Sequence, residues 1–352
     1  MSSQAAPGSQ KIKVVVSRHL GPDVMPLLLD RPELDVVVWP EERACDRRWL
    51  LENIVGATAA LVMLSEKMDQ EMFEAAGPGL RVISTMSVGY EHIDLKLAAE
   101  RKVKIGYTPD VLTEAVADVS VMLAFMASRN VRETAELVAR GDWSKTPWAP
   151  FVFCGPQLSA SWINTTRTAG FIGLGRISKA TLARLIPFGF THCIYTGNPH
   201  SKPNLEADAQ TAQKYGLQSV RRVGLDELAA ESDVVFVLAP GGPETRHIVN
   251  ESFLRKMKKT AVLVNTARGT LVDSDALAKA LREKWIWGAG LDVIEGEPDV
   301  RLDHPLLKES RCVILPHIGS ATNETRLGMG TLAVNNVLAG IQGKKLPAEL
   351  DT

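Results

Sequence analysis

The chain has 352 residues, more than a single hydrophobic core usually supports, so two domains are expected. Apolar residues make up 45% and charged residues 23%, a globular composition that argues against extensive disorder. Forty basic and 41 acidic residues leave a net charge of −1. This balance gives no electrostatic reason to expect nucleic acid or an anionic membrane as a partner.

The ends and the cysteines predict a cytoplasmic protein. Residues 1–10 are small and polar, without the apolar core of a signal peptide, and no stretch approaches the roughly 18 apolar residues of a membrane span. The four cysteines form no CxxC pair, which predicts neither a disulfide framework nor a metal site and suits a reducing compartment. They are Cys45, Cys154, Cys193 and Cys312.

In the first third of the chain, short apolar runs alternate with charge-bearing segments that have a helical pattern. This alternation predicts β/α units around a parallel sheet. The expected strands are residues 14–16, 36–38, 60–63, 82–83 and 103–105.

From about Asp110 the pattern changes to that of a long helix. Val119, Met122, Leu123 and Met126 recur at helical spacing and predict one continuous apolar stripe.

A second series of strands follows this helix and ends in another helix. The runs are apolar throughout, as expected for strands covered by helices on both faces. The expected strands are residues 169–172, 193–195, 234–238, 261–264, 289–293 and 312–315. The last helix, residues 322–340, is expected to turn Leu327, Thr331, Val334 and Leu338 to one side.

The predicted fold is therefore α/β, with two doubly wound parallel-sheet domains. The first is expected to comprise residues 1–115 and the second residues 116–321. A glycine loop in the second series marks that domain as the one that binds a dinucleotide.

This loop joins a strand to a helix in the sequence Gly173-Leu174-Gly175-Arg176-Ile177. Gly173 permits a tight turn, and Gly175 leaves room for a pyrophosphate against the backbone. The first N–H groups of the helix then bind the anion. The third small position holds Ser178 instead of glycine, which could shift the helix slightly. An ordinary glycine turn is the alternative interpretation.

The next strand end, about 20 residues on, indicates which dinucleotide is bound. NAD-binding chains place an acid there for the ribose 2′-hydroxyl, and this segment has none. Its side chains favour the 2′-phosphate of NADP(H), although no arginine stands among them, and a plain polar turn is the alternative. They are Asn198, His200, Ser201 and Lys202.

Arg268, Glu297 and His317 each follow one strand of the second series. Singly, each is more often structural than catalytic. Together they suit hydride chemistry, because a histidine can donate a proton near neutral pH and a carboxylate can orient it. The arginine can polarise a carbonyl and bind the carboxylate of a 2-oxo acid. These strand ends meet where parallel sheets bind ligands.

The segments around these residues resemble the D-isomer-specific 2-hydroxyacid dehydrogenases, and within that family the glyoxylate/hydroxypyruvate reductases. The resemblance extends from about residue 12 to residue 350. Its most specific segments are residues 82–89, 106–113, 265–269, 290–298 and 316–322.

The resemblance implies reduction of small 2-oxo acids to D-2-hydroxy acids, with His317 as the acid/base, Glu297 supporting it and Arg268 binding substrate. It implies a Rossmann domain inserted in a flavodoxin-like substrate domain that residues 322–352 complete, and a homodimer. Further substrate contacts would come from Ser87, Val88, Gly89, Trp143 and Trp148. Further cofactor contacts would come from Ala239, Pro240, Thr266, Asp292 and Gly319.

Other interpretations remain open at this stage. A formate dehydrogenase shares the layout but lacks an acid at the position of Glu297. A corepressor-like scaffold that senses dinucleotides would share the fold with little turnover. Residues 156–167 are longer than the family's usual link into the glycine-loop strand, so an impaired family member is a third alternative. The preferred acid and the direction of the reaction are not determined by these motifs.

Overall fold

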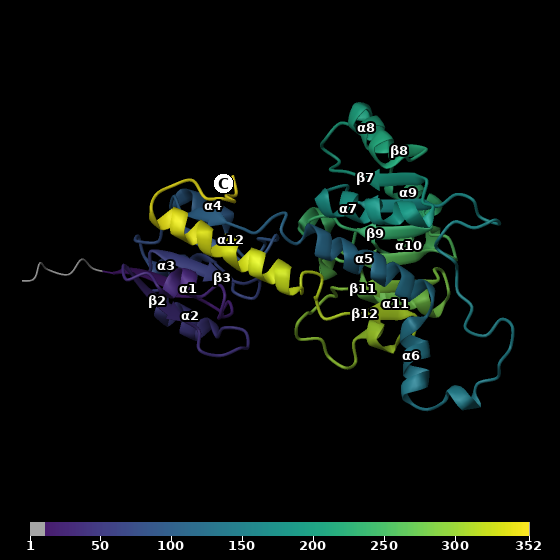
Figure 1. The fold of residues 1–352 in the computed structure, drawn as a ribbon, viewed down its shortest axis with the longest axis horizontal. Helices are drawn as coiled ribbons and strands as arrows, with labels where there is room; N and C mark the ends of the chain where they lie inside the picture. Colours follow the sequence, from purple (N-terminus) through teal and green to yellow (C-terminus); the bar gives the residue numbers. More distant parts are fainter. Residues whose placement is uncertain (1–10, 352) are drawn as a thin grey trace, which may run out of the picture. The chain divides into compact units, whose positions relative to one another are not determined.

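The computed structural model describes residues 11–351, which fall into two compact units. Unit 1 comprises the residues up to Leu112 and from Thr322 onward, and unit 2 comprises Thr113–Ala321. The expected boundary after residue 115 falls inside α5 (Thr113–Ser128), whereas the units divide before this helix begins. Figure 1 shows α12 (Asn323–Ile341) from the end of the chain lying in unit 1.

Unit 1 is built on a five-stranded parallel sheet in the order β2-β1-β3-β4-β5, and every strand expected there is confirmed. This order is that of flavodoxin-like folds. The strands are β1 (Ile12–Val16), β2 (Leu34–Val38), β3 (Ala59–Val62), β4 (Val82–Thr85) and β5 (Lys104–Gly106). The other helices are α1 (Pro26–Leu29), α2 (Arg47–Asn53), α3 (Gln70–Ala76) and α4 (Leu95–Glu100).

Helix α12 covers one face of this sheet together with α1, and α2, α3 and α4 cover the other. The predicted stripe of α12 is wrong in its first half, since Leu327 is 45% exposed. The buried side is formed by Met329, Ala333, Val334 and Val337. Gly340 lets the helix approach β4 closely, since a Cβ there would lie 2.5 Å from the Cβ of Val82.

Unit 2 is built on a seven-stranded parallel sheet in the order β12-β11-β10-β9-β6-β7-β8. The strand order reverses beside β6, which makes the carboxyl end of β6 the topological switch point of a Rossmann fold. The strands are β6 (Thr168–Ile172), β7 (His192–Thr196), β8 (Ser219–Arg222), β9 (Val234–Val237), β10 (Val262–Asn265), β11 (Gly288–Leu291) and β12 (Cys312–Ile314). The two sheets confirm the predicted fold class.

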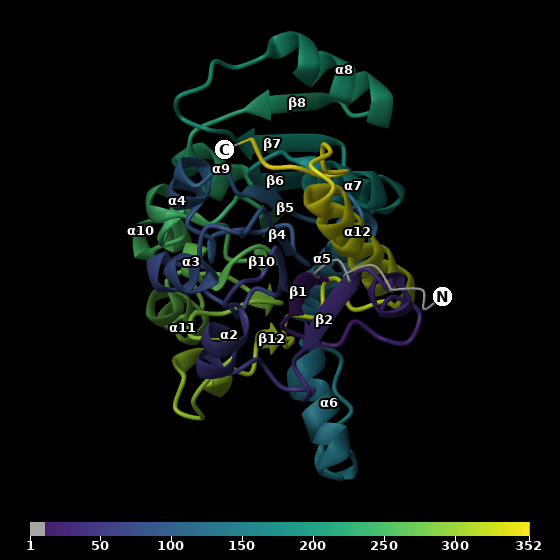
Figure 2. The same cartoon turned by 90° about the vertical axis from the view of Figure 1, so that its left-hand side faces the viewer.

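Helices cover both faces of the sheet in unit 2 (Figures 1 and 2). Along β9, Val235 and Val237 pack with α9, α10 and α11, whereas Val234 and Phe236 pack with α5 and α7. This alternation follows from the two-residue period of a strand. The remaining helices of unit 2 are α6 (Val131–Ala139), α7 (Arg176–Leu185), α8 (Leu205–Tyr215), α9 (Leu225–Glu231), α10 (Glu251–Lys256) and α11 (Ser274–Arg282).

The long helix predicted after Asp110 is α5, and three residues of the predicted stripe pack into the core, namely Val119, Leu123 and Met126. Met122 is 41% exposed, whereas Ala117, Ser120 and Ala127 are buried beside Leu123. The stripe is therefore wrong at Met122, and the large apolar residues share the buried side with small ones. The small residues let the helix backbone approach the glycines of β11.

The sequence pattern missed one strand, β8, whose residues are Ser-Val-Arg-Arg. It lies at the edge of the sheet and has only Val220 buried, so it lacks the continuous apolar run of the inner strands. Within residues 11–351, no helix is long and apolar enough to cross a membrane.

Candidate active and cofactor site

The predicted site residues of unit 2 gather at the carboxyl edge of its sheet. Arg268 follows β10, Glu297 follows β11 and His317 follows β12, and these strands are neighbours. The predicted cofactor residues follow β6, β7, β9, β10, β11 and β12 at the same edge. Ser87, Val88 and Gly89 follow β4 in unit 1.

His317 and Glu297 form a hydrogen-bonded pair. The Nδ1 atom of His317 lies 2.9 Å from Oε1 of Glu297, and the other oxygen, Oε2, accepts the backbone N–H of Ile294 at 3.1 Å. A carboxylate only accepts hydrogen bonds, so the imidazole carries its proton on Nδ1 in this contact. The ring is 38% exposed, which leaves the pair accessible to a substrate.

Asp292 holds the turn that carries His317. Its two carboxylate oxygens accept the backbone N–H groups of Ile318 at 2.8 Å and Gly319 at 2.7 Å. Its own carbonyl accepts the N–H of His317 at 2.9 Å, and His317 has a left-handed φ of 55°. Burial raises the pKa of the Asp292 carboxyl, and the two amides oppose that shift. The structure thus shows Asp292 fixing the position of the proposed acid/base.

Arg268 is placed by a buried asparagine that the sequence analysis did not single out. Asn265 is fully buried at the end of β10. Its Nδ2 donates to the carbonyl of Arg268 at 2.8 Å, and its Oδ1 accepts the N–H of Ala267 at 3.0 Å. Gly269 then lies so close to the next loop that a Cβ would come 2.2 Å from the carbonyl carbon of Ile294.

A second histidine connects the loops of Arg268 and Glu297. The backbone N–H of His247 donates to the carbonyl of Thr270 at 2.9 Å, and its Nε2 lies 2.8 Å from the carboxylate of Glu295. His247 also has a left-handed φ, of 51°. No motif identified this residue, because its two partners come from distant loops.

The glycine loop has the geometry that a pyrophosphate requires. Gly173 has a φ of 89°, and a Cβ there would come 3.0 Å from the Cα of Ala239. Gly175 begins α7 with open space around the position of a Cβ. The first amides of α7, at Arg176 and Ile177, can therefore meet an anion at close range. These observations fit a dinucleotide.

Ser178 strengthens this loop. Its side chain is fully buried, and its hydroxyl donates to the carbonyl of Gly173 at 2.6 Å. The serine thus closes the turn with a hydrogen bond that glycine could not make.

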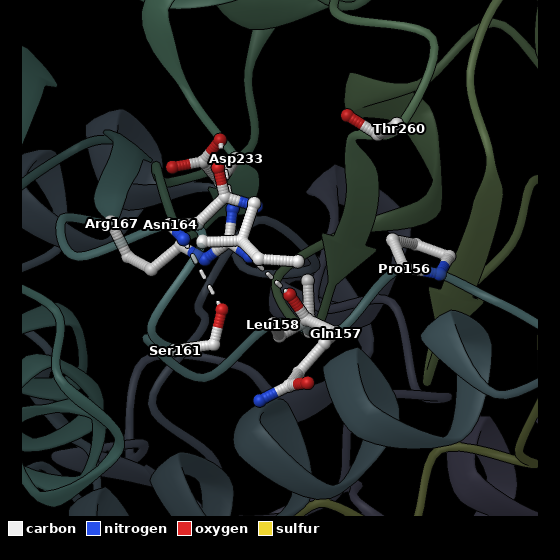
Figure 3. Close-up of a pocket in the computed structure, with 9 residues that line it drawn as sticks. Pro156, Gln157, Leu158, Ser161, Asn164, Arg167, Asp233 and Thr260 are labelled. Carbon is white, nitrogen blue, oxygen red and sulfur yellow. Dashed lines mark hydrogen bonds and ion pairs between the residues drawn. The ribbon is translucent and has the colours of Figure 1, made fainter.

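Residues 156–167 lie at the opposite end of β6 from the glycine loop. They line a pocket of about 240 Å³ with Asp233 and Thr260, which precede β9 and β10 (Figure 3). Five strand residues separate this segment from Gly173, a distance of roughly 16 Å. The long link and the glycine loop are therefore far apart in space, because β6 separates them.

Trp143 and Trp148 are exposed on unit 2. Their exposed fractions are 58% and 96%, and they lie in the segment after α6 that projects from the body of the unit (Figures 1 and 2). Within residues 11–351, no group of three or more His, Cys, Asp or Glu side chains is arranged to hold a metal ion.

Comparison with known proteins defines the class to which this fold and site belong. Residues 121–319 match the family described as D-isomer specific 2-hydroxyacid dehydrogenase, NAD binding domain. The chain belongs to this family of oxidoreductases, as the resemblance predicted.

The similar proteins include glyoxylate reductases. The chain is 40% identical to the human glyoxylate reductase/hydroxypyruvate reductase over 96% of its length and 98% of that protein's. It is 42% identical to the glyoxylate reductase of Thermofilum pendens over 89% of this chain and 87% of that one. The crystal structure of the NADPH-dependent glyoxylate/hydroxypyruvate reductase of Sinorhizobium meliloti with NADP and malonate has a TM-score of 0.78, 29% identity and 97% coverage of both chains.

Proposed function

We propose that this protein reduces glyoxylate and hydroxypyruvate to D-2-hydroxy acids with NADPH. The observation that carries the proposal is the hydrogen-bonded pair of His317 and Glu297, with Arg268 just after the neighbouring strand β10. The named activities of the similar proteins support the substrate class.

His317 is proposed to deliver the proton that the reduced carbonyl oxygen takes up. Its Nδ1 is held by Glu297, so Nε2 is the atom available to the substrate. The carboxylate stabilises the protonated ring before transfer, and Asp292 keeps the turn in place. A bound nicotinamide dinucleotide supplies the hydride in this reaction.

Arg268 is proposed to bind the oxo acid and to polarise its carbonyl, because a guanidinium presents several fixed donors to an anion. Ser87, Val88 and Gly89 are proposed to bind the carboxylate through their backbone amides. The hydroxyl of Ser87 donates to the carbonyl of Gly89 at 2.6 Å and fixes the turn.

NADP(H) is proposed over NAD(H) because the turn after β7 carries no acid. The glycine loop would hold the pyrophosphate, and the turn of residues 198–202 would face the ribose. The remaining contacts that the resemblance implied stay part of the proposal. They are Ala239, Pro240, Thr266, Asp292, His317 and Gly319 at the other strand ends.

The homodimer that the resemblance implied also remains a proposal. Large apolar side chains exposed in and after α6 support it, because monomers rarely leave many of them uncovered. They are Val138, Trp143, Trp148, Phe151 and Phe153.

The test is the initial rate of glyoxylate and hydroxypyruvate reduction with NADPH and with NADH. We expect turnover with NADPH, and His317→Ala should lower kcat by about 10²- to 10⁴-fold while the dinucleotide still binds, because only proton transfer is lost. Arg268→Ala should raise KM and lower kcat together.

Arg48→Ala is the control, since its side chain is 91% exposed in unit 1 and should leave the rates unchanged. Normal turnover by the folded His317→Ala protein would remove this histidine from the mechanism. Dinucleotide binding without turnover by the unmodified protein would support the scaffold interpretation.

A further inference from the structure

An arginine from the edge strand β8 lies against the turn that follows β7. Arg222 is the last residue of β8, and its Nη2 donates to the carbonyl of Asn198 at 2.6 Å. Its Nη1 donates to the carbonyl of Ser201 at 2.8 Å and lies 3.2 Å from the hydroxyl of Ser201. We propose that Arg222 is the residue that selects NADP(H), by binding the 2′-phosphate of the adenosine ribose.

This inference deepens the proposed function and rests on it. The sequence contains no arginine in the turn itself, and Arg222 is 24 residues beyond Asn198. Parallel pairing of β7 with β8 places Tyr195 opposite Arg222, so the two strand ends lie side by side. The carboxyl ends of these strands are where the adenosine half of a dinucleotide lies in a Rossmann fold.

The charge of Arg222 is not cancelled by its surroundings. In residues 11–351, no carboxylate lies within 4.0 Å of its guanidinium, which is held by carbonyl and hydroxyl oxygens. The nearby acid Asp208 is 5% exposed and accepts the hydroxyl of Tyr195 at 2.7 Å. Glu244 approaches the turn from the other side, 3.8 Å from Nε2 of His200. A dianionic phosphate would therefore meet a guanidinium that no carboxylate neutralises at contact distance.

The neighbouring arginine provides a contrast. Arg221 points to the other face of β8, where it forms ion pairs with Glu227 and Glu231, both at 2.8 Å. A structural arginine on this strand is thus neutralised by carboxylates, whereas Arg222 is held by uncharged groups. Carbonyl contacts orient the planar fork without neutralising it, as a phosphate-binding guanidinium requires.

Gly197 provides a second observation at the same place. A Cβ on Gly197 would lie 3.2 Å from Nε of Arg222. Gly197 directly follows β7, where NAD-binding chains place the acid that holds the 2′-hydroxyl. An aspartate at this position would meet the guanidinium, so one contact sets the preference between the two dinucleotides.

The experiment measures binding of 2′,5′-ADP and 5′-AMP by titration calorimetry, so it does not depend on turnover. These probes differ by the 2′-phosphate alone. The unmodified protein should bind 2′,5′-ADP more tightly. Arg222→Gln keeps a donor for the turn. It should weaken the binding of 2′,5′-ADP by about 10- to 100-fold, as expected for a lost charged hydrogen bond, and leave the affinity for 5′-AMP unchanged.

Arg221→Gln is the matched control on the same strand and should change neither affinity. Gly197→Asp should weaken the binding of 2′,5′-ADP by a similar factor, because the new carboxylate pairs with Arg222 and repels phosphate. The affinity for 5′-AMP should change by no more than about twofold. Thermal unfolding of each variant verifies that it is folded.

The outcomes separate this inference from the proposed function. If the unmodified protein binds both probes equally, the NADP preference itself is wrong. If it prefers 2′,5′-ADP and Arg222→Gln retains that preference, Arg222 only braces the turn and the assignment is overturned. If Arg222→Gln weakens the binding of both probes equally, the residue stabilises the adenosine-binding turn and does not select the 2′-phosphate, which overturns the assignment.

Discussion

At the scale of single residues, the site depends on groups that hold the reactive side chains. Glu297 uses one oxygen for His317 and the other for the backbone of Ile294, so neither the carboxylate nor the ring can turn freely. The carboxylate of Asp292 likewise fixes the turn after His317, because it accepts two backbone N–H groups of that turn. Such fixed contacts position a proton donor before the substrate arrives.

Replacing Glu297 by glutamine tests this arrangement. The variant removes the negative charge that stabilises a protonated His317, while retaining an oxygen that can accept from the ring. We expect kcat to fall by about 10- to 100-fold.

The measurement is kcat, together with dinucleotide affinity, for both proteins. Glu295→Gln is a matched control, because Glu295 contacts His247 and Arg246 instead of His317. An unchanged kcat in Glu297→Gln would mean that this carboxylate does not act on the acid/base.

The sequence predicted the placement of Arg268, Glu297 and His317 because each follows an apolar run that could only be a buried parallel strand. It could not predict Arg222 or His247. The strand of Arg222 lies at the sheet edge and lacks the apolar signal, and His247 meets its partners only after three loops have folded together. Contacts between distant loops leave no local periodicity.

At the scale of elements, unit 2 is held together by close contacts between glycines and a helix. A Cβ on Gly290 of β11 would lie 2.8 Å from the Cβ and the carbonyl oxygen of Leu123 in α5. Gly288, on the same strand, lies against the carbonyl of Ala127. The stripe expected from large apolar residues omitted the small residues, such as Ala127, that also belong to the close side of α5.

The contact at Gly290 predicts the effect of one methyl group. Gly290→Ala should destabilise the protein by about 1–3 kcal/mol, because the helix backbone has to move away from the sheet. Denaturant unfolding followed by circular dichroism measures this change. Gly79→Ala is the control, since a Cβ there would lie 4.0 Å from the nearest atom, the carbonyl oxygen of Ala57. Equal stability of the two variants would contradict the close packing of α5.

At the scale of the whole molecule, the proposed catalytic and cofactor residues follow the carboxyl ends of the strands. In unit 2 the carboxyl edge carries the glycine loop and the three proposed active-site residues, while the amino edge carries residues 156–167. That segment has its own anchors. Arg167 donates to the carbonyls of Gln157 and Ser159, and Ala160 donates to the carbonyl of Phe188.

This separation predicts that the segment can change without loss of function. Trp162 and Ile163 are 90% and 68% exposed, so replacing both by serine should leave kcat/KM and dinucleotide affinity within about twofold, as expected for exposed surface sites. Arg167→Ala should instead lower stability by about 1–3 kcal/mol, because it removes two hydrogen bonds of the segment and the ion pair with the largely buried Asp233. Its dinucleotide affinity should stay unchanged, since the loop of Gly173 lies beyond the far end of β6. Fluorescence titration with NADPH and denaturant unfolding measure both quantities in each variant. A tenfold loss of dinucleotide affinity in the double serine variant, at unchanged stability, would mean that residues 156–167 act on the glycine loop through β6. The length of this segment would then be a cause of impaired activity.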